Sequence, residues 1–407
     1  MSEDDDALVW KCPCLFQADP DIAGIGVICS FVIAAVMANI STCLYLMLFR
    51  CGCSPQEEIQ SFHRSIRSED FNPIDRFMRH YMDTKILSSC REVSWLGSLL
   101  DRLEQPLSEL VQSLADVQLA TGIAMLTAAI IRLNHGTITV YHFNTVLNLA
   151  WLSSNVHLLA LLVIRTKILK SMKQGQRPSY RSRGGGWKKA VQESLGAGLD
   201  VIIRVSGMLF LAGLLLYGSY VSGAEGWYDN YNCPASCSLG RRKAGSPEIW
   251  MVANFVLVLW EYPRRCLMLW PSAWEIWLDR LRHRVVDDKS ITRLAAGTSK
   301  LPLWRRLFNC VWYVLASETL DVLVGGIVWF SLGVWWIYYD RNYMYSVSPA
   351  EESEKENIVD GFGQLVPLLV LGVPLLQAIH TYCEQSRVNG QRAAIENKTW
   401  GEPVCYY

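Results

Sequence analysis

The stretch that decides the fold is residues 22–49, IAGIGVICSFVIAAVMANISTCLYLMLF, which contains no charged residue. A helix needs about 20 apolar residues to cross a hydrocarbon core roughly 30 Å thick. A continuous rather than alternating apolar run of this length indicates a helix, whose backbone hydrogen bonds are satisfied internally in lipid. The sequence therefore predicts an all-α membrane protein, a bundle of seven transmembrane helices. The other six runs are residues 111–133, 140–164, 199–221, 246–260, 317–339 and 358–380.

The fifth run is the shortest, because Glu261, Pro263, Arg264 and Arg265 follow its apolar core. A re-entrant or interfacial helix is the alternative there. Loop charge favours a crossing: residues 165–197 hold nine basic residues against one acidic, and residues 261–316 hold ten against five. Short basic loops lie on the cytoplasmic side, so helices four and five must both cross. This predicts an outside N-terminus and a cytoplasmic C-terminus, in the plasma membrane or another membrane of the secretory pathway.

The predicted organisation alternates membrane segments with loops, and two cytoplasmic loops contain amphipathic helices. These are Ile74 to Leu87 and Trp274 to Leu281, where apolar residues recur at helical spacing beside charged ones. Such helices lie on the membrane surface, or dock a cytoplasmic protein partner. The segments are an outer N-terminal segment (1–21), helices one to three (22–164) with a cytoplasmic loop (50–110), a basic cytoplasmic loop (165–197), helices four and five (198–260) around an outer cysteine-containing loop (222–246), a basic amphipathic loop (261–316), helices six and seven (317–380) and a cytoplasmic tail (381–407).

Composition limits the partners. The chain has 38 basic and 38 acidic residues and a formal net charge of zero, so no nucleic acid or other polyanion is expected as a partner. The expected partner is the lipid bilayer, and no cofactor is implied.

The cysteines divide by predicted side. Cys12, Cys14, Cys233 and Cys237 fall on the oxidising outer side, where a disulfide is expected, and four cysteines allow three pairings. A zinc site from the same four is the less favoured alternative, and no metal is predicted. Cys51 and Cys53 follow helix one on the inner side, where S-palmitoylation or ordinary free thiols are the alternatives.

Polar residues inside the membrane are costly and are the first place to look for function. At 100° per residue, Asn144, Asn148, Trp151 and Asn155 form one stripe of helix three, whereas His142 and His157 fall on the opposite side. We expect this helix to be central and its stripe to line a ligand pocket. Hydrogen bonding between helices is the alternative.

Two carboxylates, Glu318 and Asp321, open helix six on one face. They could relay protons or hold a cation, or they could compensate the helix dipole. The sequence has no GxSxG elbow, no HExxH and no GxxxxGK phosphate loop.

These observations favour a non-enzymatic receptor or sensor with a pocket around the helix-three stripe. A transporter or channel is the first alternative, with His142, His157, Glu318 and Asp321 along its path. An enzyme that acts on an apolar substrate, with the same carboxylates as acid and base, is the second.

Three stretches carry a resemblance: residues 19–27 (DPDIAGIGV), 118–125 (QLATGIAM) and 141–157 (YHFNTVLNLAWLSSNVH). Together they resemble an uncharacterised family of multi-pass integral membrane proteins of filamentous fungi. The likeness is strongest over the first three helices. It implies a fungal setting and carries over no activity and no site.

Overall fold

The computed structural model describes residues 14–49, 94–173, 187–229, 231–238, 246–269 and 320–399, with single positions between 81 and 88 and between 302 and 317. These residues are almost entirely helical, and one isolated β-bridge joins Thr139 to Pro234. The helices are α1 (Pro20–Ala23), α2 (Ile25–Phe49), α6 (Ser94–Asn134), α7 (Val140–Lys173), α8 (Trp187–Ser222), η2 (Trp227–Asp229), η3 (Ala235–Ser238), α9 (Ser246–Met268), the π-helical η4 (Asp321–Gly326), α14 (Ile327–Val347), α15 (Ala350–Lys355), α16 (Phe362–Val370) and α17 (Gly372–Thr399).

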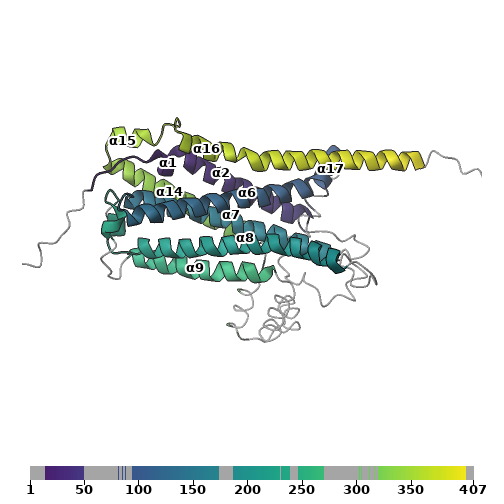
Figure 1. The fold of residues 1–407 in the computed structure, drawn as a ribbon, viewed down its shortest axis with the longest axis horizontal. Coiled ribbons are helices and arrows are strands. Elements are labelled where there is room, and N and C mark those ends of the chain that lie inside the picture. Colours follow the sequence, from purple (N-terminus) through teal and green to yellow (C-terminus); the bar gives the residue numbers. More distant parts are fainter. Residues whose placement is uncertain are drawn as a thin grey trace, which may run out of the picture.

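Five stretches of helix are long and apolar enough to cross a membrane: Pro20–Leu46, Arg102–Asn134, Val140–Ile168, Val201–Ser222 and Phe362–Val388. The all-helical membrane class predicted from the sequence is therefore confirmed in its coarse form. The described helices lie roughly parallel in one bundle (Figure 1).

α7 is the central helix. It packs against α2, α6, α8, α9 and α14, and 72% of its most apolar window is buried inside the protein. The polar residues on two opposite faces of this helix predict such a position, since neither face can meet lipid without cost.

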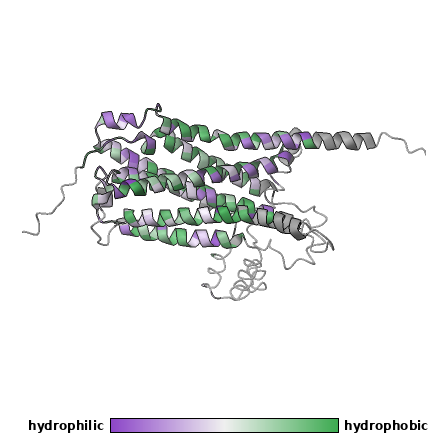
Figure 2. Cartoon of the chain, viewed as in Figure 1, coloured by the Kyte–Doolittle hydropathy of each residue, from purple (hydrophilic) through white to green (hydrophobic). Residues whose placement is uncertain are grey.

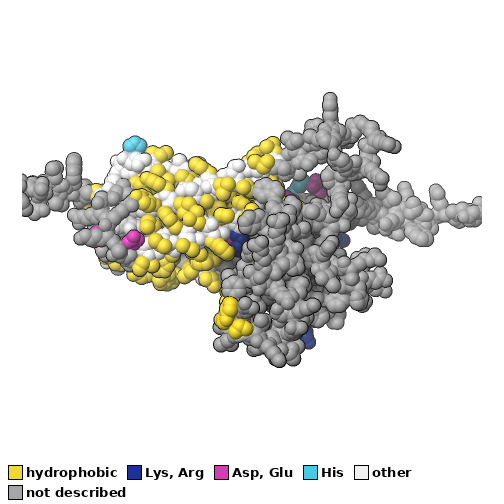
Figure 3. Space-filling view, turned by 90° about the horizontal axis from the view of Figure 1, so that it is seen from below, with side chains coloured by type: hydrophobic (Ala, Val, Ile, Leu, Met, Phe, Trp, Pro, Cys, Tyr) yellow, Lys and Arg dark blue, Asp and Glu magenta, His cyan; other side chains and the backbone are white. Residues whose placement is uncertain are grey.

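The surface of the bundle is apolar. Figure 2 shows hydrophobic residues along the middle of the helices, and Figure 3 shows hydrophobic side chains over much of the described face, with few charges among them. Large apolar side chains such as Phe210, Leu259 and Leu376 are 56–67% exposed. A soluble protein rarely exposes so much contiguous apolar surface, whereas a bilayer covers it.

Several helix ends differ from the predicted spans. α6 begins at Ser94, well before residue 111, and contains Pro106. The seventh predicted helix is broken between α16 and α17 at Leu371. Pro374 has no N–H to donate to the carbonyl four residues earlier, which explains the break. α17 then continues to Thr399, so most of the predicted tail is helical.

α16 packs against α1 and α2 at one end of the bundle. Gln364 of α16 is fully buried and accepts a hydrogen bond from the backbone N–H of Gly26, at 3.1 Å. Its amide nitrogen donates to the carbonyl of Ile358, at 2.8 Å. A Cβ at Gly26 would lie 2.9 Å from the side chain of Gln364, so glycine permits this close approach.

Candidate functional site

The end of the bundle that holds α1, η2, η3 and α15 is closed by segments that cross over it (Figure 1). Cys14 and Cys233 form a disulfide that joins the N-terminal segment to the loop after α8. Trp227 of this loop is fully buried and packs edge-on against Phe143 of α7, with ring centroids 5.7 Å apart. Cys237 is also disulfide-bonded. The sequence left three pairings open, and Cys12 lies outside the described residues.

Glu356 is the centre of the first buried polar cluster, and none of its surface is exposed. Its carboxylate lies 3.0 Å from Nε2 of His142 and accepts a hydrogen bond from the hydroxyl of Tyr141 at 3.3 Å. Phe16 stacks on the imidazole of His142, and Nδ1 of the same ring lies 2.7 Å from the hydroxyl of Thr139. The predicted path residue His142 is thus held on both nitrogens by described neighbours.

Asp340 near the end of α14 is the centre of the second buried cluster, and it is 1% exposed. It accepts hydrogen bonds from Nδ2 of Asn144 at 2.5 Å, from Nδ2 of Asn148 at 3.1 Å and from the hydroxyl of Tyr231 at 2.8 Å. Burial and the Asp340 carboxylate raise the pKa of Tyr231 well above its ordinary value, so its hydroxyl stays a donor. Asn144 and Asn148, two residues of the predicted stripe, therefore bind Asp340 of α14 and do not line a cavity.

Arg341 joins these clusters to the start of the chain. Its guanidinium donates to the carbonyls of Ala23 and Glu356 and to the side chain of Asn357. It also lies over the ring of Tyr345, 4.7 Å from the centroid. The pKa of Tyr345 lies above its ordinary value because the side chain is partly buried, and the Glu356 carboxylate adds to the effect.

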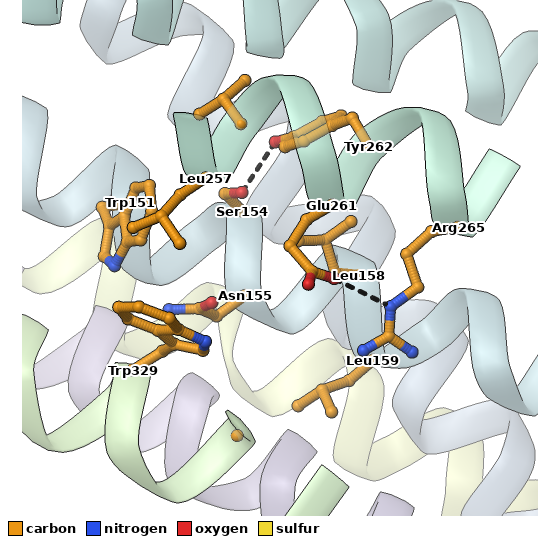
Figure 4. A pocket seen from close by; sticks show the side chains of 12 residues that line it. Trp151, Ser154, Asn155, Leu158, Leu159, Leu257, Glu261, Tyr262, Arg265 and Trp329 are labelled. Atoms are coloured by element: carbon orange, nitrogen blue, oxygen red, sulfur yellow. Dashed lines mark hydrogen bonds and ion pairs between the residues drawn. The ribbon is translucent and has the colours of Figure 1, made fainter. Parts of the chain in front are cut away.

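A pocket lies farther along α7, toward its C-terminal end. Its floor is α7, one wall is α9, and the other wall is the end of η4 with the start of α14 (Figure 4). Its cavity volume is about 40 Å³. Its lining includes two residues of the predicted stripe, Trp151 and Asn155. A cavity of this volume holds a small polar group or a few water molecules, whereas a whole drug-sized ligand needs about 300 Å³ or more.

Aromatic rings and a few polar groups line this pocket. Trp151 and Trp329 meet edge to face, with ring centroids 6.2 Å apart, and the amide of Asn155 lies beside them (Figure 4). The Nδ2 atom of Asn155 is buried and has no hydrogen-bond acceptor among the described residues. A buried donor without a partner is costly, so this atom needs an acceptor that the described residues do not supply.

Three charged residues of α9 lie at the end of the pocket nearest the C-terminus of that helix. Glu261 of α9 accepts hydrogen bonds from Arg264 at 2.6 Å and from Arg265 at 3.5 Å, and Arg265 is 5% exposed. Nearby, the hydroxyls of Ser154 and Tyr262 lie 2.7 Å apart. Gly326, the last residue of the π-helical η4, also lines the pocket, and π-helical turns inside α-helices often occur at functional sites.

The remaining predicted site residues are distributed as follows. His157 is buried on the side of α7 that faces away from the pocket lining, and neither of its ring nitrogens has a hydrogen-bond partner among the described residues. Glu318, the side chain of Asp321, Cys51 and Cys53 lie outside the described residues, as do both predicted amphipathic segments apart from Tyr81 and Lys85.

The sequence analysis did not identify Asp340 and Glu356 as buried polar groups. A signal for Asp340 exists, because Gly333, Ile337, Asp340 and Met344 recur at spacings of four, three and four, which is one face of a helix. No such pattern marks Glu356, whose burial depends on how the segment after α15 folds back.

Comparison with protein-family models, with curated proteins and with solved structures finds no match to this chain. The resemblance of the first three helices to fungal membrane proteins stays a prediction.

Proposed function

We propose that this protein is a seven-helix integral membrane receptor or sensor that binds a small ligand in the pocket between α7, α9 and α14. The observation that supports this proposal is the buried Nδ2 atom of Asn155 beside two tryptophans, which has no hydrogen-bond acceptor among the described residues. An unmet polar group and an ion pair inside the apolar part of a bundle are features expected of a binding site.

Charge-free segments support the crossing of the membrane. α6 has no Asp, Glu, Lys or Arg between Asp116 and Arg132, and α8 has none between Arg204 and its end at Ser222. At 1.5 Å per residue these segments are roughly 24 and 27 Å long, close to the thickness of a hydrocarbon core. Arg204 forms an ion pair with Asp116 at 2.9 Å, which places two charges from neighbouring helices at one level.

The same reasoning adds α9 and α14 to the five candidate spans. α14 with η4 has no charged residue from Val322 to Tyr339, roughly 27 Å of helix. α9 has a shorter apolar core, from Ile249 to Trp260, but it lies along α7 and α8 in the bundle. Its inner charges, Glu261 with Arg264 and Arg265, are paired with one another, which lowers the cost of their depth.

Topology is the first test. The chain carries a glycosylation acceptor, Asn397-Lys398-Thr399, at the end of α17. With seven crossings and an outside N-terminus, the protein expressed in a eukaryotic secretory system is expected to remain unglycosylated at Asn397. A cytosolic protease should cleave the tail in intact vesicles.

Asn397→Gln is the matched control, since it removes the acceptor and should leave the mass of the protein unchanged. An endoglycosidase-sensitive mass shift that this substitution abolishes would give an even number of crossings. The receptor proposal would then lose its support, and α9 would be the first helix to reassign.

Ligand binding is the second test. We expect a small-molecule extract of a filamentous fungus to raise the melting temperature of the purified full-length chain in nanodiscs. A ligand at 100 times its Kd stabilises the folded state by about 2.7 kcal/mol. Asn155→Leu should remove most of the shift, whereas Trp335→Leu, which changes a side chain 51% exposed on α14, should keep it.

Total-lipid and aqueous extracts are assayed separately in this experiment. No shift with either, in a sample that melts cooperatively, would contradict the proposal of a ligand-binding protein.

A transporter is the second candidate, because α7 meets buried polar groups at two levels, Asp340 of α14 at one and the pocket with Glu261 of α9 at the other. Flux of the active extract component in proteoliposomes, lost with Asn155→Leu, would favour it over a receptor. The described residues add no support to the enzyme alternative.

A further inference from the structure

The route to the pocket from the capped end of the bundle is filled. The Glu356 and Asp340 clusters are buried beneath the disulfide-linked segments. Below them Leu149, Leu152 and Ile337 pack in one buried cluster with 0–5% exposure. A Cβ at Gly333 would already lie 2.8 Å from the side chain of Leu152, so the space between α7 and α14 is tight at this level.

The side between α9 and α14 is different. Near the capped end these two helices meet through Trp250 and Trp336, whose ring centroids are 5.0 Å apart. Toward the other end both pack on α7, and the pocket lies between them. The neighbouring outward side chains are apolar and exposed, including Val256 and Leu259 of α9, each 61% exposed, and Ile327 of α14, 54% exposed. A molecule dissolved in the bilayer therefore meets apolar surface on both walls.

The polar groups of the pocket define the chemistry of the ligand. Ser154 and Tyr262 satisfy each other, and Glu261 is engaged by Arg264 and Arg265. The two charged residues that line the pocket, Glu261 and Arg265, pair with each other. The lining therefore presents no single charge to an ionised headgroup. The Nδ2 atom of Asn155 has no hydrogen-bond acceptor among the described residues. The rest of the lining, with Leu158, Leu159, Leu257 and Val258, is apolar.

We infer that the pocket takes the oxygen-bearing end of an uncharged lipid, whose single hydroxyl or carbonyl oxygen enters between α9 and α14 and accepts a hydrogen bond from Asn155, while the apolar body of the lipid lies along the exposed walls outside. The inference rests on the proposed function and adds the ligand class and the route. A sterol and an isoprenoid alcohol share this chemistry. Rigid rings favour the sterol, because a ligand that is rigid in its bound form loses less conformational entropy on binding.

The test uses a sterol that carries a photoreactive diazirine on its ring system, with the full-length chain in nanodiscs. We expect labelled peptides from α7, α9 and α14, and competition by the unlabelled sterol but not by the parent hydrocarbon without its oxygen. Asn155→Leu, which keeps the number of side-chain heavy atoms and removes the amide, should weaken labelling about tenfold, which is the loss expected for one buried hydrogen bond. Trp335→Leu is the control and should label as the unmodified chain does.

Each outcome separates the two proposals. Competition by an isoprenoid alcohol but not by the sterol would assign the ligand to the chain-like lipids. If only the aqueous extract raises the melting temperature, and Asn155→Leu abolishes that shift, the lipid inference is overturned and the proposed function stands. If no extract raises it, the proposed function itself fails. Should Asn155→Leu not fold, Trp329→Leu replaces it with the same expected loss, because Trp329 lines the pocket and Trp335 does not.

Discussion

Replacing Asp340 with alanine is expected to lower the free energy of unfolding by about 2–4 kcal/mol. The substitution removes the acceptor shared by Asn144, Asn148 and Tyr231 and leaves three buried donors without a partner. The measurement is unfolding of the full-length protein in mixed micelles with increasing SDS.

Two controls define the cause of this loss. Asp340→Asn keeps one carbonyl oxygen as an acceptor and should cost less than alanine. Tyr338→Phe changes a side chain two residues away that is 63% exposed and should stay within about 0.5 kcal/mol of the unmodified chain. Equal stability of Asp340→Ala and the unmodified protein would show that the cluster contributes nothing to the fold.

Replacing Glu356 with alanine is expected to lower the free energy of unfolding by about 2–4 kcal/mol, because it leaves buried hydrogen-bonding groups without their partner. His142 and Tyr141 would lose their shared acceptor, and the N–H of Asp19 would lose the carboxylate oxygen that it meets at 3.3 Å. We therefore also expect faster amide hydrogen exchange in the segment before α1.

The matched control is Glu354→Ala, which removes an exposed carboxylate two residues away and should change stability little. A similar effect of both substitutions would assign the loss to general charge rather than to the buried contacts.

The helices were predictable because their signal is local. Each long apolar run follows from its own residues and from the thickness of a bilayer. The central place of α7 was predictable for the same reason, since its own polar residues lie on two faces. The helix ends were less predictable. α6 begins at Ser94 and α17 ends at Thr399, and the outer turns of both helices consist of polar sequence, in which hydropathy does not mark a helix end.

The candidate site was predictable only in part. The stripe of α7 correctly grouped its members on one face, yet Asn144 and Asn148 face Asp340 while Trp151 and Asn155 face the pocket. What divides them is the partner helix, α14, and sequence periodicity says nothing about which helix lies opposite. The pairing of Glu356 with His142, 214 residues apart, depends on the same non-local information.

The contact between Gln364 and Gly26 has a consequence for biosynthesis. The two residues are 338 positions apart in the chain, and a ribosome that adds 5–20 residues per second needs roughly 17–70 s to make that length. During this interval α2 has been made but lacks α16, the helix that covers its N-terminal end. A holding chaperone or the insertion machinery itself would have to shelter that face. Substitutions at Gly26, which prevent the close approach of Gln364, should therefore leave this face of α2 uncovered after synthesis is complete and lower the yield of folded protein.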